Sequence, residues 1–345
     1  MRETGSKPRR ILFVGLLCAC FALTLGAARV GRTEATPVAP PGVFTISDNV
    51  NLVLLDVSVK DRRGGFVTGL KKDNFHVFED GHARDITQFA NVDTPVTIGL
   101  VVDNSGSMRL KRQEVIAAGL AFAKQSNPKD QFFVVNFNNS VVRGLPPKML
   151  FTDDLQQLRA ALYYGAPVGQ TALYDAIGYA LKHLEYSHLE KRTLIVVSDG
   201  GDNASRASFP DLMKLIEASR ATVYTVGLYD PEDHDLNPGV LRKVAMVSGG
   251  QFFEPQTLEE VTPVFQKISD YIRNCYTIGY IPDDLTDRRV VRNVKVTATE
   301  ADRKLVVRTR TSYITTPLSE LTADQSRKDI QRRDIHQTDM QQRTQ

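Results

Sequence analysis

From residue 94 onward, short apolar runs alternate with stretches in which apolar residues recur at helical spacing. Four runs are almost continuously apolar, "VTIGLVVD", "QFFVVNF", "RTLIVVSD" and "ATVYTVGL", as is typical of strands covered on both faces of a parallel sheet. The helical spacing predicts helices over residues 110–125, 152–162, 172–186, 210–220, 239–247 and 258–274. This alternation predicts an α/β fold, a doubly wound and mostly parallel sheet flanked by helices.

Strand-like patterns stand on both sides of this region. "VNLVLLDVSVKD" and "FHVFEDGHARDITQF" precede it, and an Asp-Gly pair in the second predicts a turn between two strands. "YTIGYIP", "RNVKVTAT" and "LVVRTRTSYI" follow it. Because each group has too few strands for a stable fold of its own, we expect both to pair into one small antiparallel β domain.

The expected domain organisation follows from these patterns. The α/β domain spans residues 94–274 and is inserted into the β domain, which is built from residues 43–93 and 275–316. Residues 317–345 have few large apolar side chains and mixed charge, which predicts a disordered tail.

The first 42 residues predict export. Basic residues in "MRETGSKPRR" precede the apolar run "ILFVGLLCACFALTLGAA", the layout of a signal peptide over residues 1–28. A run of about 18 apolar residues also reaches the lower limit for spanning a bilayer, so an uncleaved membrane anchor is the alternative. Residues 29–42 contain "TEATPVAPPG", which predicts a linker. We therefore expect an exported protein that is periplasmic, at the cell surface or secreted.

Charge and cysteine content limit the kinds of partner and covalent cross-link that we expect. The formal net charge is +3, and the four basic residues and one acid of the first ten residues contribute all of it. The remainder is neutral, which argues against a nucleic-acid partner and against electrostatic membrane binding. Cys18 and Cys20 lie in the signal, so Cys275 is expected to remain alone and buried, without an internal disulfide.

Oxygen-bearing side chains follow the predicted buried strands. Asp103, Ser105 and Ser107 alternate in "LVVDNSGSM", Thr171 precedes a helix in "GQTALYDAI", and Asp199 ends a strand in "IVVSDGGDN". The carboxyl ends of parallel strands meet at one rim, where ligands bind in doubly wound folds. Carboxylates and hydroxyls without a nearby histidine or cysteine form a hard donor set, suited to Mg²⁺, Mn²⁺ or Ca²⁺.

Other residues of the same segments support this rim. Asn136 and Asn138 in "VVNFNNS" are expected on it, and Gly106 is expected to permit the tight turn between the two serines. Asp202 either binds a water molecule of the ion or caps the following segment.

These residues resemble the metal-ion-dependent adhesion site of von Willebrand factor type A domains. That family's motif, Asp-x-Ser-x-Ser followed by a Thr and an Asp in two further loops, matches Asp103, Ser105, Ser107, Thr171 and Asp199 without substitution. The resemblance covers residues 96–274. It implies that the two serines, and sometimes the threonine, bind the ion directly, that the acids often act through water, and that a partner's carboxylate takes an open coordination position. The flanking strands are similar to an exported bacterial group related to this domain, for which no activity is implied.

The sequence therefore predicts a non-enzymatic, adhesion-type module that binds a divalent cation, with Mg²⁺ preferred, and through it an exposed Asp or Glu of a partner protein. One alternative is a metal-dependent hydrolase that uses the ion to activate water. No histidine base is placed at the rim, and His183 and His188 are expected on a helix surface. The other alternative is a structural component of an envelope assembly.

Overall fold

The structure is a computed structural model that describes residues 52–199, 201–229, 237–282, 289–300 and 303–315. The predicted signal, linker and tail lie outside the described residues. Among the residues described, no helix has the length and apolar character that a membrane span requires.

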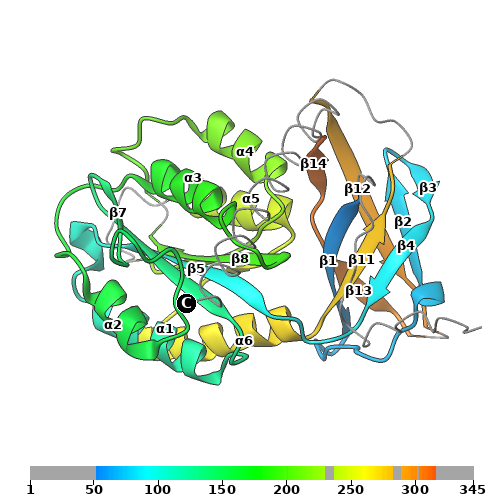
Figure 1. The fold of residues 1–345 in the computed structure, drawn as a ribbon, viewed down its shortest axis with the longest axis horizontal. Coiled ribbons are helices and arrows are strands. Elements are labelled where there is room, and N and C mark those ends of the chain that lie inside the picture. Colours follow the sequence, from blue (N-terminus) through cyan, green and yellow to red (C-terminus); the bar gives the residue numbers. More distant parts are fainter. Residues whose placement is uncertain (1–51, 200, 230–236, 283–288, 301–302, 316–345) are drawn as a thin grey trace, which may run out of the picture. The chain divides into compact units, whose positions relative to one another are not determined.

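A six-stranded sheet forms the centre of the α/β region, in the order β10-β9-β8-β5-β6-β7 (Figure 1). All neighbouring strands in it are parallel except β6 and β7, which are antiparallel. The prediction of a doubly wound, mostly parallel sheet is confirmed. The strands are β5 (Val96–Asp103), β6 (Gln131–Phe137), β7 (Val141–Arg143), β8 (Lys191–Ser198), β9 (Thr222–Gly227) and β10 (Phe252–Phe253).

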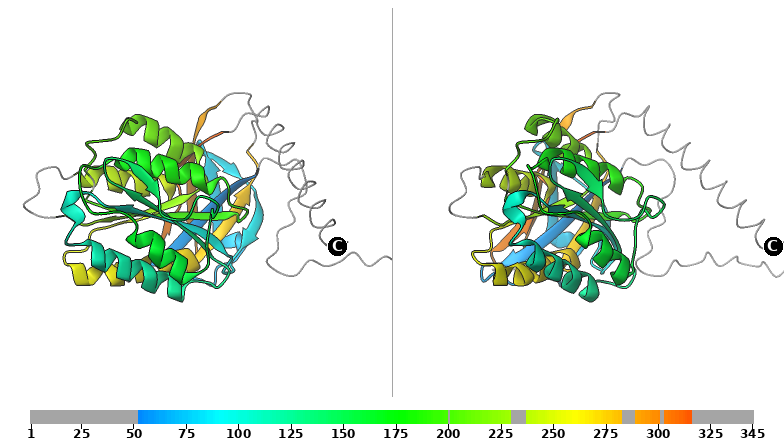
Figure 2. Two further views of the ribbon diagram at one scale, coloured as in Figure 1. Left: turned by 60° about the vertical axis from the view of Figure 1, so that its left-hand side comes forward. Right: turned by 90° about the vertical axis from the view of Figure 1, so that its left-hand side faces the viewer.

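Helices cover both faces of this sheet (Figures 1 and 2), with α1, α2 and α6 on one face and α3, α4 and α5 on the other. Their bounds are α1 (Arg112–Gln125), α2 (Leu155–Tyr163), α3 (Leu173–Leu184), α4 (Phe209–Ala218), α5 (Pro238–Ser248) and α6 (Val261–Arg273). Short 3₁₀ turns are η1 (Lys72–Asn74), η2 (Gly106–Met108) and η3 (Leu258–Glu260).

The predicted start of α2 at Thr152 is wrong by three residues. Thr152 instead forms an isolated antiparallel bridge with Phe132, in which each N–H donates to the other's carbonyl at 2.7–2.8 Å. The helix begins after Asp154, whose carboxylate accepts the N–H of Gln156 at 2.7 Å. A nearby acid therefore caps the helix, because the hydroxyl residue is held by the sheet.

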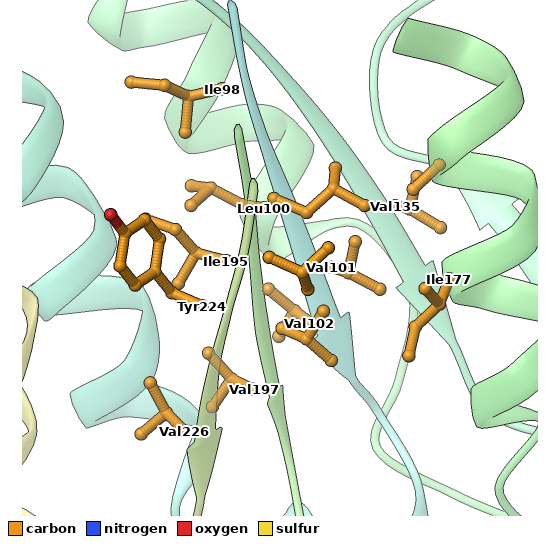
Figure 3. Close-up of a cluster of buried hydrophobic side chains, with 14 of the residues drawn as sticks. Ile98, Leu100, Val101, Val102, Val135, Ile177, Ile195, Val197, Tyr224 and Val226 are labelled. Carbon is orange, nitrogen blue, oxygen red and sulfur yellow. The ribbon is translucent and has the colours of Figure 1, made fainter. Parts of the chain in front are cut away.

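The core of the α/β region surrounds β5, in which all eight residues are buried. Figure 3 shows Leu100, Val101 and Val102 of this strand beside apolar side chains of the neighbouring strands and of α3. The sequence of β5 is continuously apolar because helices cover both faces of the sheet. Packing on both faces holds the end of β5, where Asp103 lies.

Two four-stranded antiparallel sheets form the β region, in the orders β13-β1-β11-β4 and β14-β12-β2-β3. Each combines strands from before and after the α/β region, as predicted. The hydroxyls of Tyr280 and Tyr313 both donate to the buried carboxylate of Glu79 at 2.7 Å and so join the two sheets. The strands are β1 (Val53–Asp61), β2 (Phe75–Glu79), β3 (His82–Arg84), β4 (Ile86–Ala90), β11 (Cys275–Tyr280), β12 (Val291–Ala298), β13 (Leu305–Arg308) and β14 (Ser312–Ile314).

The chain leaves and re-enters the β region at neighbouring strands. β4 and β11 are antiparallel partners, and Ala90 lies opposite Thr277. Arg273, the last residue of α6, donates to Asp93 at 2.6 Å and to the buried carboxylate of Asp130. One guanidinium therefore ties together the two segments that connect the β region to the α/β region.

Candidate metal site

The carboxylate of Asp103 is fixed where β5 ends. Its side chain is fully buried, Oδ1 accepts the N–H of Ser105 at 2.8 Å, and Oδ2 accepts the hydroxyl of Ser198 at 2.6 Å. Ser198 is the last residue of β8, the parallel neighbour of β5. The ends of the two central strands are thus joined through this acid. The sequence alone does not indicate Ser198 as a partner, because only the pairing of β5 with β8 brings its hydroxyl to Asp103.

The two serines connect Asp103 to the second acid. The hydroxyl oxygens of Ser105 and Ser107 lie 3.0 Å apart, and the Ser107 hydroxyl donates to Oδ2 of Asp199. Ser105 and Asp199 are buried, whereas Ser107 is exposed. Four of the five predicted site residues therefore form one hydrogen-bonded chain that opens to solvent at Ser107.

Thr171 lies in a loop that backbone hydrogen bonds hold beside the other motif loops. Its N–H donates to Oδ1 of Asn203 at 2.8 Å, and its carbonyl accepts the N–H groups of Asn203 and Ala204 at 3.0 and 3.1 Å. The N–H of Gly106 donates to the carbonyl of Gly169 at 3.1 Å. The loop that carries Thr171 is thus bonded to both of the other loops of the motif.

Gly165 and Gly169, and not Gly106, have the special backbone conformation in these loops. Gly169 has φ +88°, and a Cβ placed on it would overlap Oδ1 of Asn139, which accepts the N–H of Gln170. Gly106 has no positive φ, and a Cβ there would meet only the Gly169 carbonyl oxygen, at an ordinary 3.7 Å. The expectation that Gly106 permits the turn is therefore wrong, because Gly106 and Ser107 lie in a 3₁₀ turn that any residue adopts, and Ser105 precedes it in an extended conformation.

The electrostatics of the site favour a cation. Burial and, to a lesser extent, the nearby negative charge of Asp199 raise the pKa of Asp103 to about 6, against the lowering effect of the hydrogen bonds from Ser198 and Ser105. A buried carboxylate close to a second one is stabilised in its charged form by a bound cation. In the described part of the chain, no group of three or more His, Cys, Asp and Glu side chains could hold a metal. An ion at this rim would therefore depend on hydroxyl ligands as well as on the two acids.

The asparagines predicted at the rim support the loops. Nδ2 of Asn136 donates to the carbonyl of Ala161 at 2.8 Å, so this side chain binds the end of α2. The backbone carbonyl of Asn138 accepts the N–H of Ala172 at 2.8 Å, and its side chain accepts the N–H of Ser140 at 3.1 Å. Asn138 therefore supports the Thr171 loop through its backbone.

Asp202 caps a helix, but not the one expected. Its Oδ1 accepts the N–H of Tyr174 at 3.1 Å and the hydroxyl of Ser205 at 2.6 Å. Tyr174 lies in the first turn of α3, which precedes Asp202 in the chain, so the expectation that it caps the following segment is wrong. The cap fixes α3 directly after Thr171.

His183 is buried, contrary to the expectation that it lies on a helix surface. Only 4% of it is exposed, Nε2 lies 2.9 Å from the carbonyl oxygen of Leu150, and its ring packs on Phe133 with centroids 4.5 Å apart. His188 is exposed, as expected. Of the histidines that the structure describes, none is hydrogen-bonded to a residue of the candidate site.

One family match lies within the α/β region. Residues 98–201 match the family described as von Willebrand factor type A domain. No curated protein matches the chain. Among solved structures, a von Willebrand factor type A protein from Catenulispora acidiphila is 14% identical, with 80% of this chain and 78% of that chain covered and a TM-score of 0.48.

Two further solved structures cover about half of this chain. Proximal thread matrix protein 1 from the mussel byssus, with a zinc-occupied metal-ion-dependent adhesion site, is 16% identical over 52% of this chain, with a TM-score of 0.43, and the match spans 48% of its own length. The von Willebrand factor domain of the type V pilus tip protein Mfa5 from Porphyromonas gingivalis is 15% identical over 52% of this chain and 96% of that one, with a TM-score of 0.41.

The family match, over residues 98–201, includes all five motif residues, most of β5 and the whole of β6 and β8. Together with the doubly wound sheet, it shows that the α/β region of this chain has the von Willebrand factor type A fold.

Proposed function

We propose that this chain is an exported, adhesion-type module that binds a partner protein through a divalent cation. The observation that carries the proposal is the hydrogen-bonded chain of Asp103, Ser105, Ser107 and Asp199 at the carboxyl ends of β5 and β8. The hydroxyl of Ser107 within this hydrogen-bonded chain is exposed, so an ion beside it would be accessible to a second protein.

The side chains have distinct proposed roles. Ser105 and Ser107 provide hydroxyl ligands, and Thr171 provides a third from the adjacent loop. Asp103 and Asp199 supply the negative charge and hold the ion's water molecules. Because all of these donors are oxygens, Mg²⁺ is the preferred ion, with Mn²⁺ and Ca²⁺ as alternatives.

The partner is proposed to supply an exposed Asp or Glu, whose oxygen replaces a metal-bound water. A hydrolase with the same ion would need a general base, and none of the described histidines contacts the site. The chemistry supported here is coordination without turnover.

Calorimetric titration of the mature chain with MgCl₂, MnCl₂ and CaCl₂ tests the ion. We expect saturable binding to the wild type and a loss of about tenfold or more in affinity for Ser105→Ala. Ser126→Ala is a matched control, because it also removes one hydroxyl, which donates to the carbonyl of Phe122 at 3.0 Å at the far end of α1. Failure of the wild type to bind any of the three ions contradicts the proposal.

Water relaxation of the Mn²⁺-loaded protein tests the partner chemistry. Acetate or a peptide with one glutamate should displace a metal-bound water and lower the relaxivity, whereas the matching glutamine peptide should not. If Ser105→Ala unfolds the protein, and if carboxylates leave the relaxivity of the wild type unchanged, the ion is structural, as the envelope-component alternative requires.

A further inference from the structure

The carboxyl end of α2 is held by three side chains from other elements. A helix end leaves its last carbonyls without intrahelical partners. Here Nδ2 of Asn136 donates to the carbonyl of residue 161 at 2.8 Å, and Nδ2 of Asn104 donates to the carbonyl of residue 164 at 3.4 Å. Nη2 of Arg112 lies 3.4, 2.9 and 3.3 Å from the carbonyl oxygens of residues 162, 163 and 164. Every carbonyl from residue 161 to residue 164 therefore has a side-chain donor.

Asn104 is also part of the candidate metal loop, since it stands between Asp103 and Ser105. Its own N–H donates to the carbonyl of Phe137 at 2.7 Å, and its carbonyl accepts the N–H of Val168 at 2.9 Å. With the side-chain bond to Tyr164, this one residue contacts both ends of the segment 164–168. Thr171 follows that segment by three residues.

The orientation of the Asn104 carboxamide is set by these contacts. The residue is 2% exposed, and its Oδ1 is buried without a hydrogen-bond partner in the described structure. A flipped amide would point Oδ1 at the carbonyl oxygen of Tyr164 and would lose the donor there. A buried unpaired acceptor destabilises the folded state, a cost that an apolar residue at this position would avoid.

We propose that Asn104 is a positioning residue of the candidate metal site. Its carboxamide and backbone attach the segment 164–171 to the end of β5, so that the Thr171 hydroxyl is presented to an ion held by Ser105 and Ser107. Arg112 and Asn136 hold the other side of the same segment by fixing the end of α2. This inference rests on the proposed function for the identity of the ligand, but the attachment itself is a property of the metal-free protein.

Hydrogen exchange of the metal-free mature chain, in excess chelator, tests the attachment. In Asn104→Ala, the amide of Val168 and its neighbours up to Ala172 should exchange faster, on the order of tenfold, than in the wild type. Asn104→Asp is a second, isosteric variant that removes the donor without leaving a cavity, and it should accelerate the same amides. Asn127→Ala is the matched control, because that side chain bonds Asp93 and the N–H of Lys129 beyond the far end of α1. Unchanged exchange in both Asn104 variants overturns the proposal.

A double-mutant cycle on Mg²⁺ affinity tests the positioning. Asn104→Ala should weaken binding roughly tenfold, and Thr171→Ala should then cost much less in the Asn104→Ala background than in the wild type. Additive losses would mean that Asn104 acts on stability alone, and they overturn the positioning role. If the wild type binds no divalent ion, the proposed function fails, and the hydrogen exchange alone then decides whether Asn104 attaches the segment.

Discussion

The charge of Asp103 is expected to destabilise the metal-free protein at neutral pH. Burial, with the charge of Asp199 added, raises its pKa to about 6 from an ordinary value of 3.8. A difference of about two pKa units, at 1.36 kcal/mol each, corresponds to about 3 kcal/mol. Since the folded state holds its proton more tightly, the free energy of unfolding falls as the pH rises from about 4 to about 6, and the full loss is present above that window.

Asp103→Asn removes this charge and keeps the shape. Its Oδ1 can accept the N–H of Ser105, and its Nδ2 can donate to the Ser198 hydroxyl oxygen, which accepts as well as donates. We expect the variant to be more stable than the metal-free wild type by about 3 kcal/mol at pH 7 and to be equally stable below pH 4. The variant should also lose ion binding.

Urea unfolding in chelator, repeated from pH 4 to pH 8, measures this difference. Asp211→Asn is a control for which the pH dependence of the stability difference should have the opposite sign, because hydrogen bonds from Ser208 and then Lys214 lower the pKa of that exposed carboxyl. Saturating Mg²⁺ should stabilise the wild type alone. If Asp103→Asn is the less stable protein at pH 7 without metal, or if the difference does not change with pH, the account of this buried acid is refuted.

Three further outcomes are expected. Gly169→Ala should weaken Mg²⁺ binding and lower the melting temperature, because the alanine would have a positive φ and a Cβ that clashes with Asn139. Gly106→Ala should change neither, and equal effects of the two substitutions in calorimetry would contradict the assignment of the turn. Arg310→Ala should cost about 2–3 kcal/mol in urea unfolding, since its buried guanidinium donates to two carbonyls at the end of α4, while exposed Arg242→Ala should stay within about 0.5 kcal/mol. Burial lowers the pKa of His183, so below a pH of about 6.5 the unfolded state binds the proton preferentially. Acidification should therefore lower the melting temperature less in His183→Gln than in the wild type, and parallel profiles of melting temperature against pH would exclude this residue as the cause.

Much of this fold could be predicted because its main signals are local. The apolar run of β5 reports burial on both faces, and the acid or hydroxyl after each central strand lies at the rim by topology alone. The pairing of the two flanks also followed from the small number of strands in each. These arguments need only the order of elements along the chain.

Some residues were predicted wrongly or not at all, because their environment is set by contacts between distant segments. His183 is expected at the surface because its ring is polar, yet the ring packs on Phe133 and Nε2 lies beside the carbonyl oxygen of Leu150. Gly106 lies in the motif, but the positive φ angles belong to Gly165 and Gly169, in another loop. The role of Asn104 depends on where α2 ends, which no feature of the motif reveals.

The pairing of β4 with β11 has a consequence for the order of folding. Since Ala90 lies opposite Thr277, the whole α/β region is topologically the loop of a β-hairpin. While that loop is unfolded, closing its about 180 residues costs about 4–5 kcal/mol of chain entropy, from (3/2)RT ln n. A folded α/β region, with its two ends tied by Arg273, removes this cost before the strands meet. The β region is therefore expected to assemble last, on a template that the α/β region provides.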